Sequence, residues 1–266
     1  MPFVFSGRTA VITGAASGIG RALALALADQ GMKLVLADLD LATVEGLAEE
    51  IERQGGRTLA SRTDVSDPED VERLAELADK EFGGTDLLCN NAGIMTADRY
   101  RPVWEFTLAE WKAMIDVNLM GVVNGLRSFV PRMLAQRTAG HLLNTASAAG
   151  LITGAISVPY SVSKHGVVRI SEGLFAALRK RRAPIGVTVL CPGLVRTAIY
   201  AASGNQPEDG AEGFVFDETT AEPEEIARIA LQAISQHRLY ALTTTAFDKA
   251  IEARATAILA RRNPDL

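Results

Sequence analysis

The feature that most constrains the fold of this chain is a regular alternation of short apolar runs with helical patterns. The runs lie at 9–13, 33–38, 58–61, 86–93, 140–147, 186–193 and 239–243, and helical periodicity follows at 18–30, 41–54, 68–82, 108–135, 160–180 and 223–236. Continuous Val- and Leu-rich runs are typical of strands buried on both faces, as in a parallel sheet between helices. The pattern therefore predicts a single doubly wound α/β domain over residues 1–266, with about seven parallel strands.

Composition excludes several classes of function. The 266 residues carry a net charge of -5, which offers no electrostatic footprint for nucleic acid or an anionic membrane. One basic run, at 179–182, is interpreted as a solvated helix end, with a binding patch as the alternative. The opening residues are too quickly polar for a secretory signal, and no apolar run reaches the ~18 residues of a membrane span, so we expect a cytoplasmic protein.

The cysteines and histidines do not suggest a metal site. Cys89 and Cys191 both end apolar runs, and we expect them to be buried free thiols. The three histidines lie far apart, at His141, His165 and His237. Because no G-x-S-x-G occurs either, a serine hydrolase is disfavoured. We expect no metal.

A glycine-rich turn follows the first apolar run. It holds Gly14, Gly18 and Gly20, which allow a tight turn and let the backbone approach a pyrophosphate at the start of the next helix. Asp38 ends the second run, near the spacing expected of a ribose-binding acid. A glycine cluster alone is weak evidence, but this context predicts dinucleotide binding.

Tyr160 and Lys164 are four residues apart at the start of a predicted helix. That spacing places both side chains on one helix face, where an ammonium can lie close to a phenol. Taken alone, such a pair is ordinarily a surface contact worth a few tenths of a kcal/mol. Other motifs decide between this reading and a catalytic one.

From about Arg8 to Thr197 the chain resembles the short-chain dehydrogenase/reductase family. The likeness rests on motifs in the family's order: TGAASGIG at 13–20, Asp38, Asp64 with Val65, NNAG at 90–93, Asn118, Ser147, YSVSK at 160–164, and PGLVRT at 192–197. Ser147 also precedes Tyr160 by the family's spacing. The resemblance implies a Rossmann fold and an oxidoreductase that uses a nicotinamide cofactor, here NAD.

The family pattern gives the tyrosine and lysine a chemical reading. Oxidising a secondary alcohol requires a base, and a free phenol is too weakly ionised at neutral pH to serve. A lysine ammonium one turn away favours the phenolate, so Tyr160 is expected to be the acid/base and Lys164 the group that tunes it. The resemblance adds that Lys164 holds the nicotinamide ribose, that Ser147 hydrogen-bonds the substrate oxygen, and that Asn118 supports a water chain to Lys164.

The resemblance also implies a set of cofactor-binding residues. Asp38 is expected to bind the adenosine ribose, although it could merely cap the helix beginning near Leu41. Asp64 is expected to meet the adenine amino group, although it could be only a turn residue. The full set is Gly14, Ser17, Gly18, Ile19, Gly20, Asp38, Asp64, Val65, Asn91, Ala92, Gly93, Tyr160, Lys164, Pro192, Gly193, Val195 and Thr197.

The substrate side is expected to be apolar. The candidate lining residues are Ile94, Met95, Leu151, Ile156, Val158 and Leu194. A stretch at about 198–222, carrying Tyr200, Phe214 and Phe216, is interpreted as a mobile lid, with a plain surface loop as the alternative. These features favour a secondary alcohol or ketone with a hydrophobic or aromatic body. The stretches at 121–134 and 140–151 also resemble, more loosely, bacterial enzymes that oxidise benzylic alcohols of lignin-derived aryl ethers.

The end of the chain departs from the family pattern. A helical extension is predicted at about 246–262, with Phe247, Ile251, Ile258 and Leu259 on one stripe. We expect a homo-oligomer, a tetramer or a dimer, the dimer forming through the helices around 119–129 and 167–178. Both helices carry more apolar residues than packing on one sheet face requires.

Two other classes of function remain open at this point. The fold could host an epimerase or dehydratase that uses NAD transiently, but such relatives usually carry a separate substrate domain. It could also be a non-catalytic dinucleotide sensor, but a sensor would be expected to have lost Ser147, Tyr160 or Lys164. The sequence therefore favours an NAD-dependent dehydrogenase.

Overall fold

The computed structural model contains one parallel sheet of seven strands in the order β3-β2-β1-β4-β5-β6-β7. It describes residues 2–95, 101–154, 157–197, 199 and 220–264. The strands are β1 (Thr9–Thr13), β2 (Lys33–Asp38), β3 (Arg57–Arg62), β4 (Leu87–Asn90), β5 (Gly140–Thr145), β6 (Ile185–Cys191) and β7 (Tyr240–Leu242). The chain builds outward in one direction to β3 and then in the other from β4, so the strand order reverses between β1 and β4. This confirms the predicted doubly wound Rossmann-like fold.

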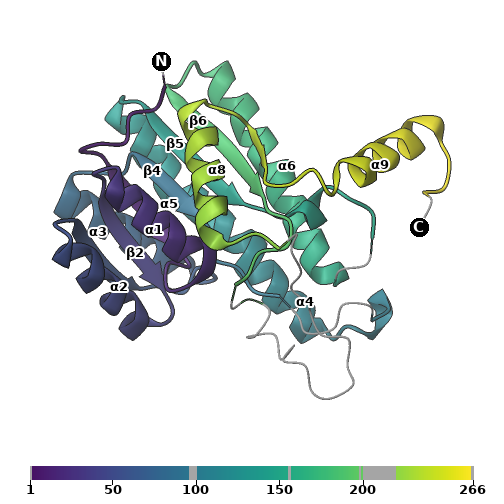
Figure 1. Cartoon of the computed structure of the whole chain (residues 1–266), viewed down its shortest axis with the longest axis horizontal. Coiled ribbons are helices and arrows are strands. Elements are labelled where there is room, and N and C mark those ends of the chain that lie inside the picture. The colour runs from purple at the N-terminus through teal and green to yellow at the C-terminus, as the bar shows by residue number, and fades with distance from the viewer. Residues whose placement is uncertain (1, 96–100, 155–156, 198, 200–219, 265–266) are drawn as a thin grey trace.

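Helices cover both faces of the sheet (Figure 1). They are α1 (Gly18–Asp29), α2 (Leu41–Arg53), α3 (Pro68–Phe82), α4 (Leu108–Ile115), α5 (Gly121–Gln136), α6 (Val158–Lys180), α8 (Pro223–Ser235) and α9 (Asp248–Ala260). The cores show that α1, α2 and α8 pack on one face and α3, α5 and α6 on the other. In Figure 1 α9 extends away from this layered body.

Alternate residues of each strand supply the two cores. Ile12 faces the core under α1 and α8, whereas the adjacent Val11 faces the core under α3 and α5. Leu36 and Val35 divide in the same way on β2. All four side chains are fully buried. Burial on both faces is the reason why these strands appear as unbroken apolar runs in the sequence.

The predicted helix at 108–135 is not continuous. A π-helical turn at Asp116–Met120 separates α4 from α5. Asp116–Met120 holds neither glycine nor proline, and Gly121 comes only after it, so the apolar period over 108–135 did not predict the turn. Its consequence is local, because it carries Asn118.

Part of the apolar surface of α5 and α6 is buried within the chain. Phe129, Val167 and Leu178 belong to the cores described above. Leu126, Leu174 and Phe175 pack against the same cores but are only half-buried. The homo-oligomer, and a dimer through these helices, stay predictions.

The predicted apolar stripe on the C-terminal helix is also not buried as a unit. Ile258 and Leu259 are exposed by 62% and 79%, whereas Ala257 is buried. Phe247 and Ile251 are half-buried. The helix therefore contacts the body along one narrow line.

The structure confirms the expectation for the two cysteines. Cys89 and Cys191 are buried free thiols, and burial raises the pKa of both, that of Cys191 to about 12. Within the described residues, no cluster of three or more His, Cys, Asp or Glu could hold a metal ion.

Among the described helices, none combines the length and the hydropathy that a membrane span requires.

Candidate functional site

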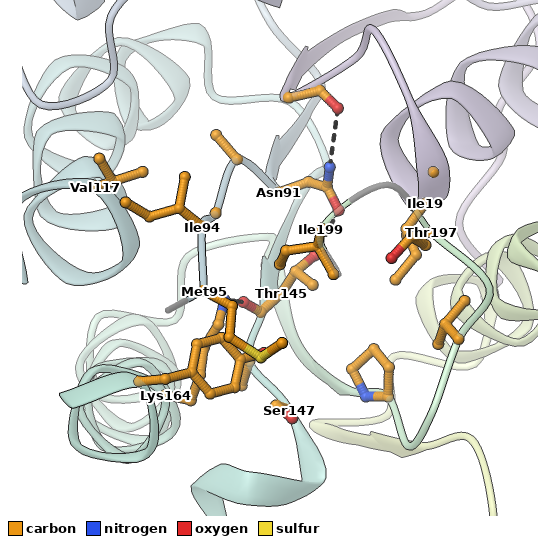
Figure 2. Close-up of a pocket in the computed structure, with 18 of the residues that line it drawn as sticks. Ile19, Asn91, Ile94, Met95, Val117, Thr145, Ser147, Lys164, Thr197 and Ile199 are labelled. Carbon is orange, nitrogen blue, oxygen red and sulfur yellow. Dashed lines mark hydrogen bonds between the residues drawn. The ribbon is translucent and has the colours of Figure 1, made fainter. Parts of the chain in front are cut away.

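A cleft of about 500 Å³ lies beyond the carboxyl ends of the strands. The ends of β1, β2, β4, β5 and β6 all contribute to it, as expected at the point where strand order reverses. It brings together nearly all of the predicted site residues: Gly14, Ser17, Gly18, Ile19, Asp38, Asp64, Val65, Asn91, Ala92, Gly93, Ser147, Tyr160, Lys164, Pro192, Gly193, Val195 and Thr197. Gly20 and Asn118 lie behind this lining. Figure 2 shows Ile19 and Thr197 well apart from Met95, Ser147 and Lys164.

The glycine loop leaves no room for a side chain at Gly14 or Gly20. A Cβ atom on Gly20 would lie 1.9 Å from the carbonyl oxygen of Gly14, and one on Gly14 would lie 2.7 Å from the Cα of Ala92. Gly14 also has φ +67°. Glycine at these two positions thus brings β1, α1 and the end of β4 into contact.

The start of α1 is suited to an anion. In the described structure, its N-cap residue Ser17 makes no side-chain capping hydrogen bond, and the first turn holds no acid. The first N–H groups of the helix therefore face the cleft with the positive end of the helix dipole. These groups fit a pyrophosphate.

Asp38 lies at the end of β2, on the cleft wall. Its Oδ2 accepts a hydrogen bond from Ala16 N–H at 3.0 Å, and its Oδ1 accepts one from Asp40 N–H at 3.2 Å. The cap of α2 is Asp40, whose Oδ1 accepts from Thr43 N–H at 3.1 Å. The alternative reading of Asp38 as the helix cap is therefore wrong.

Asp64 combines the two readings offered for it. Its Oδ1 accepts hydrogen bonds from the N–H and the hydroxyl of Ser66, at 2.9 and 2.7 Å, which is a turn interaction. Its residue also lines the cleft, together with Val65. The cap of α3 is Asp67 instead. Asp64 thus shapes the turn and still faces the cleft.

A latch of hydrogen bonds joins β1 to β4 at the floor of the cleft. Thr13 Oγ1 accepts from Asn91 N–H and Ala92 N–H, at 3.0 and 3.1 Å. The Asn91 side chain in turn donates from Nδ2 to the carbonyls of Thr13 and Gly14, and its Oδ1 accepts from Thr145 Oγ1 at 3.2 Å. Asn91 was expected to contact a ribose through its backbone, and its side chain proves to fix the glycine loop.

Ser147, Tyr160 and Lys164 meet at the other end of the cleft. Ser147 Oγ accepts from Ala149 N–H at 3.2 Å, so its own O–H can still be donated. Lys164 Nζ lies 5.6 Å from the centre of the Tyr160 ring and donates to the Thr145 carbonyl at 2.9 Å. Tyr160 is 9% and Lys164 3% exposed. The surface reading of the Tyr160–Lys164 pair is therefore wrong.

Burial also changes the charge of Lys164. Desolvation lowers the pKa of Lys164 to about 8. The side chain therefore stays mostly protonated at neutral pH, but it lies close to its titration range. A cation in this position can favour the ionised form of a neighbouring phenol.

Asn118 lies behind the cleft, in the π-helical turn. Its Oδ1 accepts from Ile94 N–H at 2.8 Å, and its Nδ2 donates to the Ile94 carbonyl and to Ser163 Oγ. Ser163 Oγ donates to the Tyr160 carbonyl at 2.7 Å. The Asn118 side chain thus connects the segment that follows β4 to the first turns of α6. The water chain expected from Asn118 to Lys164 stays a prediction.

The substrate end is apolar, although not all through the expected residues. Ile94, Met95 and Leu194 line the cleft. Leu151 and Val158 are not among its described lining residues, and Ile156 lies outside the described part of the chain. Most of the predicted lid, 198 and 200–219 with Tyr200, Phe214 and Phe216, also lies outside it.

Several lining residues were not expected from the sequence. They are Leu39, Thr63, Val117, Thr145, Ala146, Ala148, Ala149, Ile152, Ile199 and Phe247. Most of them are neighbours of predicted residues at strand ends, and extending each motif by one or two positions would have found them. Phe247 could not be found in this way, because it belongs to the segment after the last strand.

Comparison with known proteins gives concordant results. Residues 8–208 match the family model described as short chain dehydrogenase. The chain is 37% identical over 233 residues to a 1-deoxy-11-beta-hydroxypentalenate dehydrogenase of Streptomyces exfoliatus, covering 88% of this chain and 82% of that protein. A short chain dehydrogenase/reductase from Burkholderia phymatum, solved in complex with NAD, has TM-score 0.90 and 36% identity, covering 99% and 98% of the two chains. LigD from Sphingobium sp. strain SYK-6, solved in its apo form, has TM-score 0.83 and 29% identity, with 98% and 100% coverage.

Proposed function

The chain belongs to the short-chain dehydrogenase family, and from that premise we propose that it is an NAD-dependent oxidoreductase that interconverts a secondary alcohol and a ketone. The single observation that carries this proposal is the geometry of Ser147, Tyr160 and Lys164 at one end of the cleft. A hydroxyl donor, a phenol and a buried cation lie there together, opposite a dinucleotide cradle.

The cofactor half of the cleft supports NAD. The uncapped N-terminus of α1 fits the pyrophosphate, and Asp38 fits the adenosine ribose hydroxyls. The similar Burkholderia phymatum protein binds NAD. When bound, the nicotinamide supplies the acceptor or donor of hydride. Val195 and Thr197, which line the cleft after β6, would face its carboxamide.

The residues of this chain handle the proton and the substrate oxygen. In alcohol oxidation, Ser147 Oγ–H donates a hydrogen bond to the substrate oxygen and Tyr160 Oη takes the hydroxyl proton. Lys164 keeps a positive charge beside the phenol and has further N–H donors for the nicotinamide ribose. Asn118 positions Tyr160 and Lys164 through Ser163 and α6.

The lining of the reacting end favours a substrate with an apolar body. Met95, Leu194 and Phe247 contribute side chains there. Lys164 is the single cation among the described lining residues, and the chemistry already occupies it. A neutral hydrophobic or aromatic alcohol fits this surface. The similar Streptomyces exfoliatus protein is named for a hydroxylated compound.

The test is NAD reduction with a panel of secondary alcohols, followed by the appearance of reduced-nicotinamide absorbance. We expect Tyr160→Phe to keep its NAD affinity and to lose roughly 10²- to 10⁴-fold in turnover, because only the proton-transfer group is removed. Tyr240→Phe is the matched control, since Tyr240 Oη donates to Glu172 at the surface and lines no part of the cleft.

Two outcomes would contradict the proposal. NAD binding without turnover on any alcohol would favour a dinucleotide sensor. A Tyr160→Phe variant that kept about a third of the wild-type turnover, with chemistry rate-limiting, would remove Tyr160 from the acid/base role.

A further inference from the structure

The segment that connects β7 to α9, Thr243–Phe247, docks against the loop that follows β6. Gly193 N–H donates to Thr243 Oγ1 at 3.2 Å. A Cβ atom on Gly193 would lie 2.7 Å from Thr244 Cγ2 and 3.2 Å from Phe247 Cε2. The absence of a side chain at Gly193 is therefore what lets the Phe247 ring reach this position.

Phe247 lies at the reacting end of the cleft. Its neighbour Gly193 follows Pro192, whose carbonyl accepts from Ala148 N–H at 2.8 Å. Ala148 is the residue after Ser147. In the sheet order, β5 and β6 carry this end, whereas Asp38 is on β2, and three strands lie between β2 and β6. The ring of Phe247 therefore lines the cleft where the carbinol would lie and is remote from the adenosine site.

The helix behind Phe247 holds it in place. Phe247 is the N-cap residue of α9, and Ala257 is buried further along the same helix. Ala253 and Ala257 share a small hollow with Thr153, which belongs to the segment between Ser147 and Tyr160. The helix therefore contacts the loop after β6 through Phe247 and lies beside Thr153 through Ala253 and Ala257. These contacts fix the position of the Phe247 ring at the start of α9.

We propose that Phe247 is a specificity-determining residue, whose ring bounds the part of the substrate that extends from the reacting carbon. This inference rests on the proposed function and adds the wall that sets substrate size. A half-buried aromatic ring gives a small substrate apolar contact, and the same ring excludes a larger one. Leu194 and Ile199, which line the same cleft, are apolar as well.

The experiment compares two methyl carbinols that differ in size, one phenyl-substituted and one naphthyl-substituted. We expect Phe247→Ala to raise the ratio of kcat/KM for the larger over the smaller alcohol by about tenfold or more, and Phe247→Leu to raise it by less. NAD affinity should change by less than about threefold, because the ring is remote from the adenosine half of the cleft. Ile258→Ala is the matched control, since it removes an exposed apolar side chain from the same helix.

The outcomes separate this inference from the proposed function. If the wild type oxidised neither these two alcohols nor any other member of the panel, the proposed function would be overturned and this inference with it. Oxidation with an unchanged ratio in both Phe247 variants would overturn this inference alone. So would a loss of NAD affinity that matches the rise in KM, because Phe247 would then support the Gly193 loop and not the substrate. If Phe247→Ala failed to fold, Phe247→Leu would decide the question by itself.

Discussion

Asp38 has a structural task besides the ribose-binding role that we propose for it. Each of its oxygens accepts a backbone N–H, one from the glycine loop and one from Asp40, so the charge also holds the loop against the end of β2. A carboxylate oxygen has more than one acceptor site, which leaves capacity for ribose hydroxyls. A phosphate dianion at the 2′ position would instead meet a like charge.

We expect wild-type enzyme to prefer NAD over NADP by about 100-fold, since like-charge contact costs several kcal/mol. Asp38→Ala should erode this preference, mainly by weakening NAD. The measurement is kcat/KM for both cofactors in wild type and variant. Asp40→Ala is the control, because it removes the α2 cap and should lower the melting temperature without changing the ratio. Equal use of both cofactors by the wild type would refute this placement of Asp38.

At this scale the sequence was informative where chemistry lies at a strand end. Glycines, Asp38, Ser147 and Tyr160 could be placed because each follows a clear apolar run or begins a helix. The Asn91 side chain could not be assigned its role, since its partners Thr13 and Gly14 come from a strand 78 positions earlier. The place of Phe247 in the cleft could not be predicted for the same reason, because it depends on contact with Gly193, which is distant in the sequence.

Among the elements, the turn between β1 and α1 tolerates the least change. A Cβ atom at Gly20 would meet backbone atoms of Gly14, which cannot rotate away as a side chain could. Gly46, inside α2, is the opposite case, since nothing would lie within 4 Å of its added Cβ.

We expect Gly20→Ala to lower the melting temperature and to weaken NAD binding at least about tenfold, because the turn that we propose to hold the pyrophosphate must shift. Gly46→Ala should raise stability by roughly 0.5–1 kcal/mol, the usual gain for a helix interior, and leave NAD affinity unchanged. Thermal unfolding and NAD titration of both variants check this. Unaltered NAD affinity in a folded Gly20→Ala protein would show that the loop does not hold the pyrophosphate.

The elements themselves followed from periodicity, with the exception of the π-helical turn. A π turn adds one residue to a helix without changing which residues are apolar, so no pattern over 108–135 could reveal it. The predicted ends of strands and starts of helices lie close to the observed ones, because capping residues and glycines mark these positions in the sequence.

At the scale of the whole molecule, one buried histidine links stability to pH. His141 is fully buried in β5, and its Nε2 lies 2.8 Å from Thr188 Oγ1. Thr188 donates its own hydrogen to the Arg238 carbonyl, so Nε2 of His141 is the donor in that pair. Burial, with the nearby His237, lowers the pKa of His141 to about 3.

The folded state thus binds this proton less readily than the unfolded state, whose ordinary pKa is 6.5. The contribution of His141 is fully present above pH 6.5 and is lost as the pH falls from 6.5 towards 3. We expect wild type to lose about 3–5 kcal/mol more than His141→Gln over this range. Urea unfolding at several pH values measures it, with His165→Gln as the control outside this cluster. Parallel stability curves for wild type and His141→Gln would contradict the assignment.

The hydrogen bonds between Thr13 and Asn91 couple dinucleotide binding to folding. They join the ends of β1 and β4, two strands that are distant in the chain, and this junction lies at the centre of the sheet. A dinucleotide that contacts both strand ends binds only the assembled junction. It therefore stabilises the native chain by mass action, by about 2.7 kcal/mol at a free concentration 100 times its dissociation constant. Cellular NAD would then act on the lifetime of the folded enzyme as well as on its turnover, and a melting temperature that climbs with NAD concentration is the sign of it.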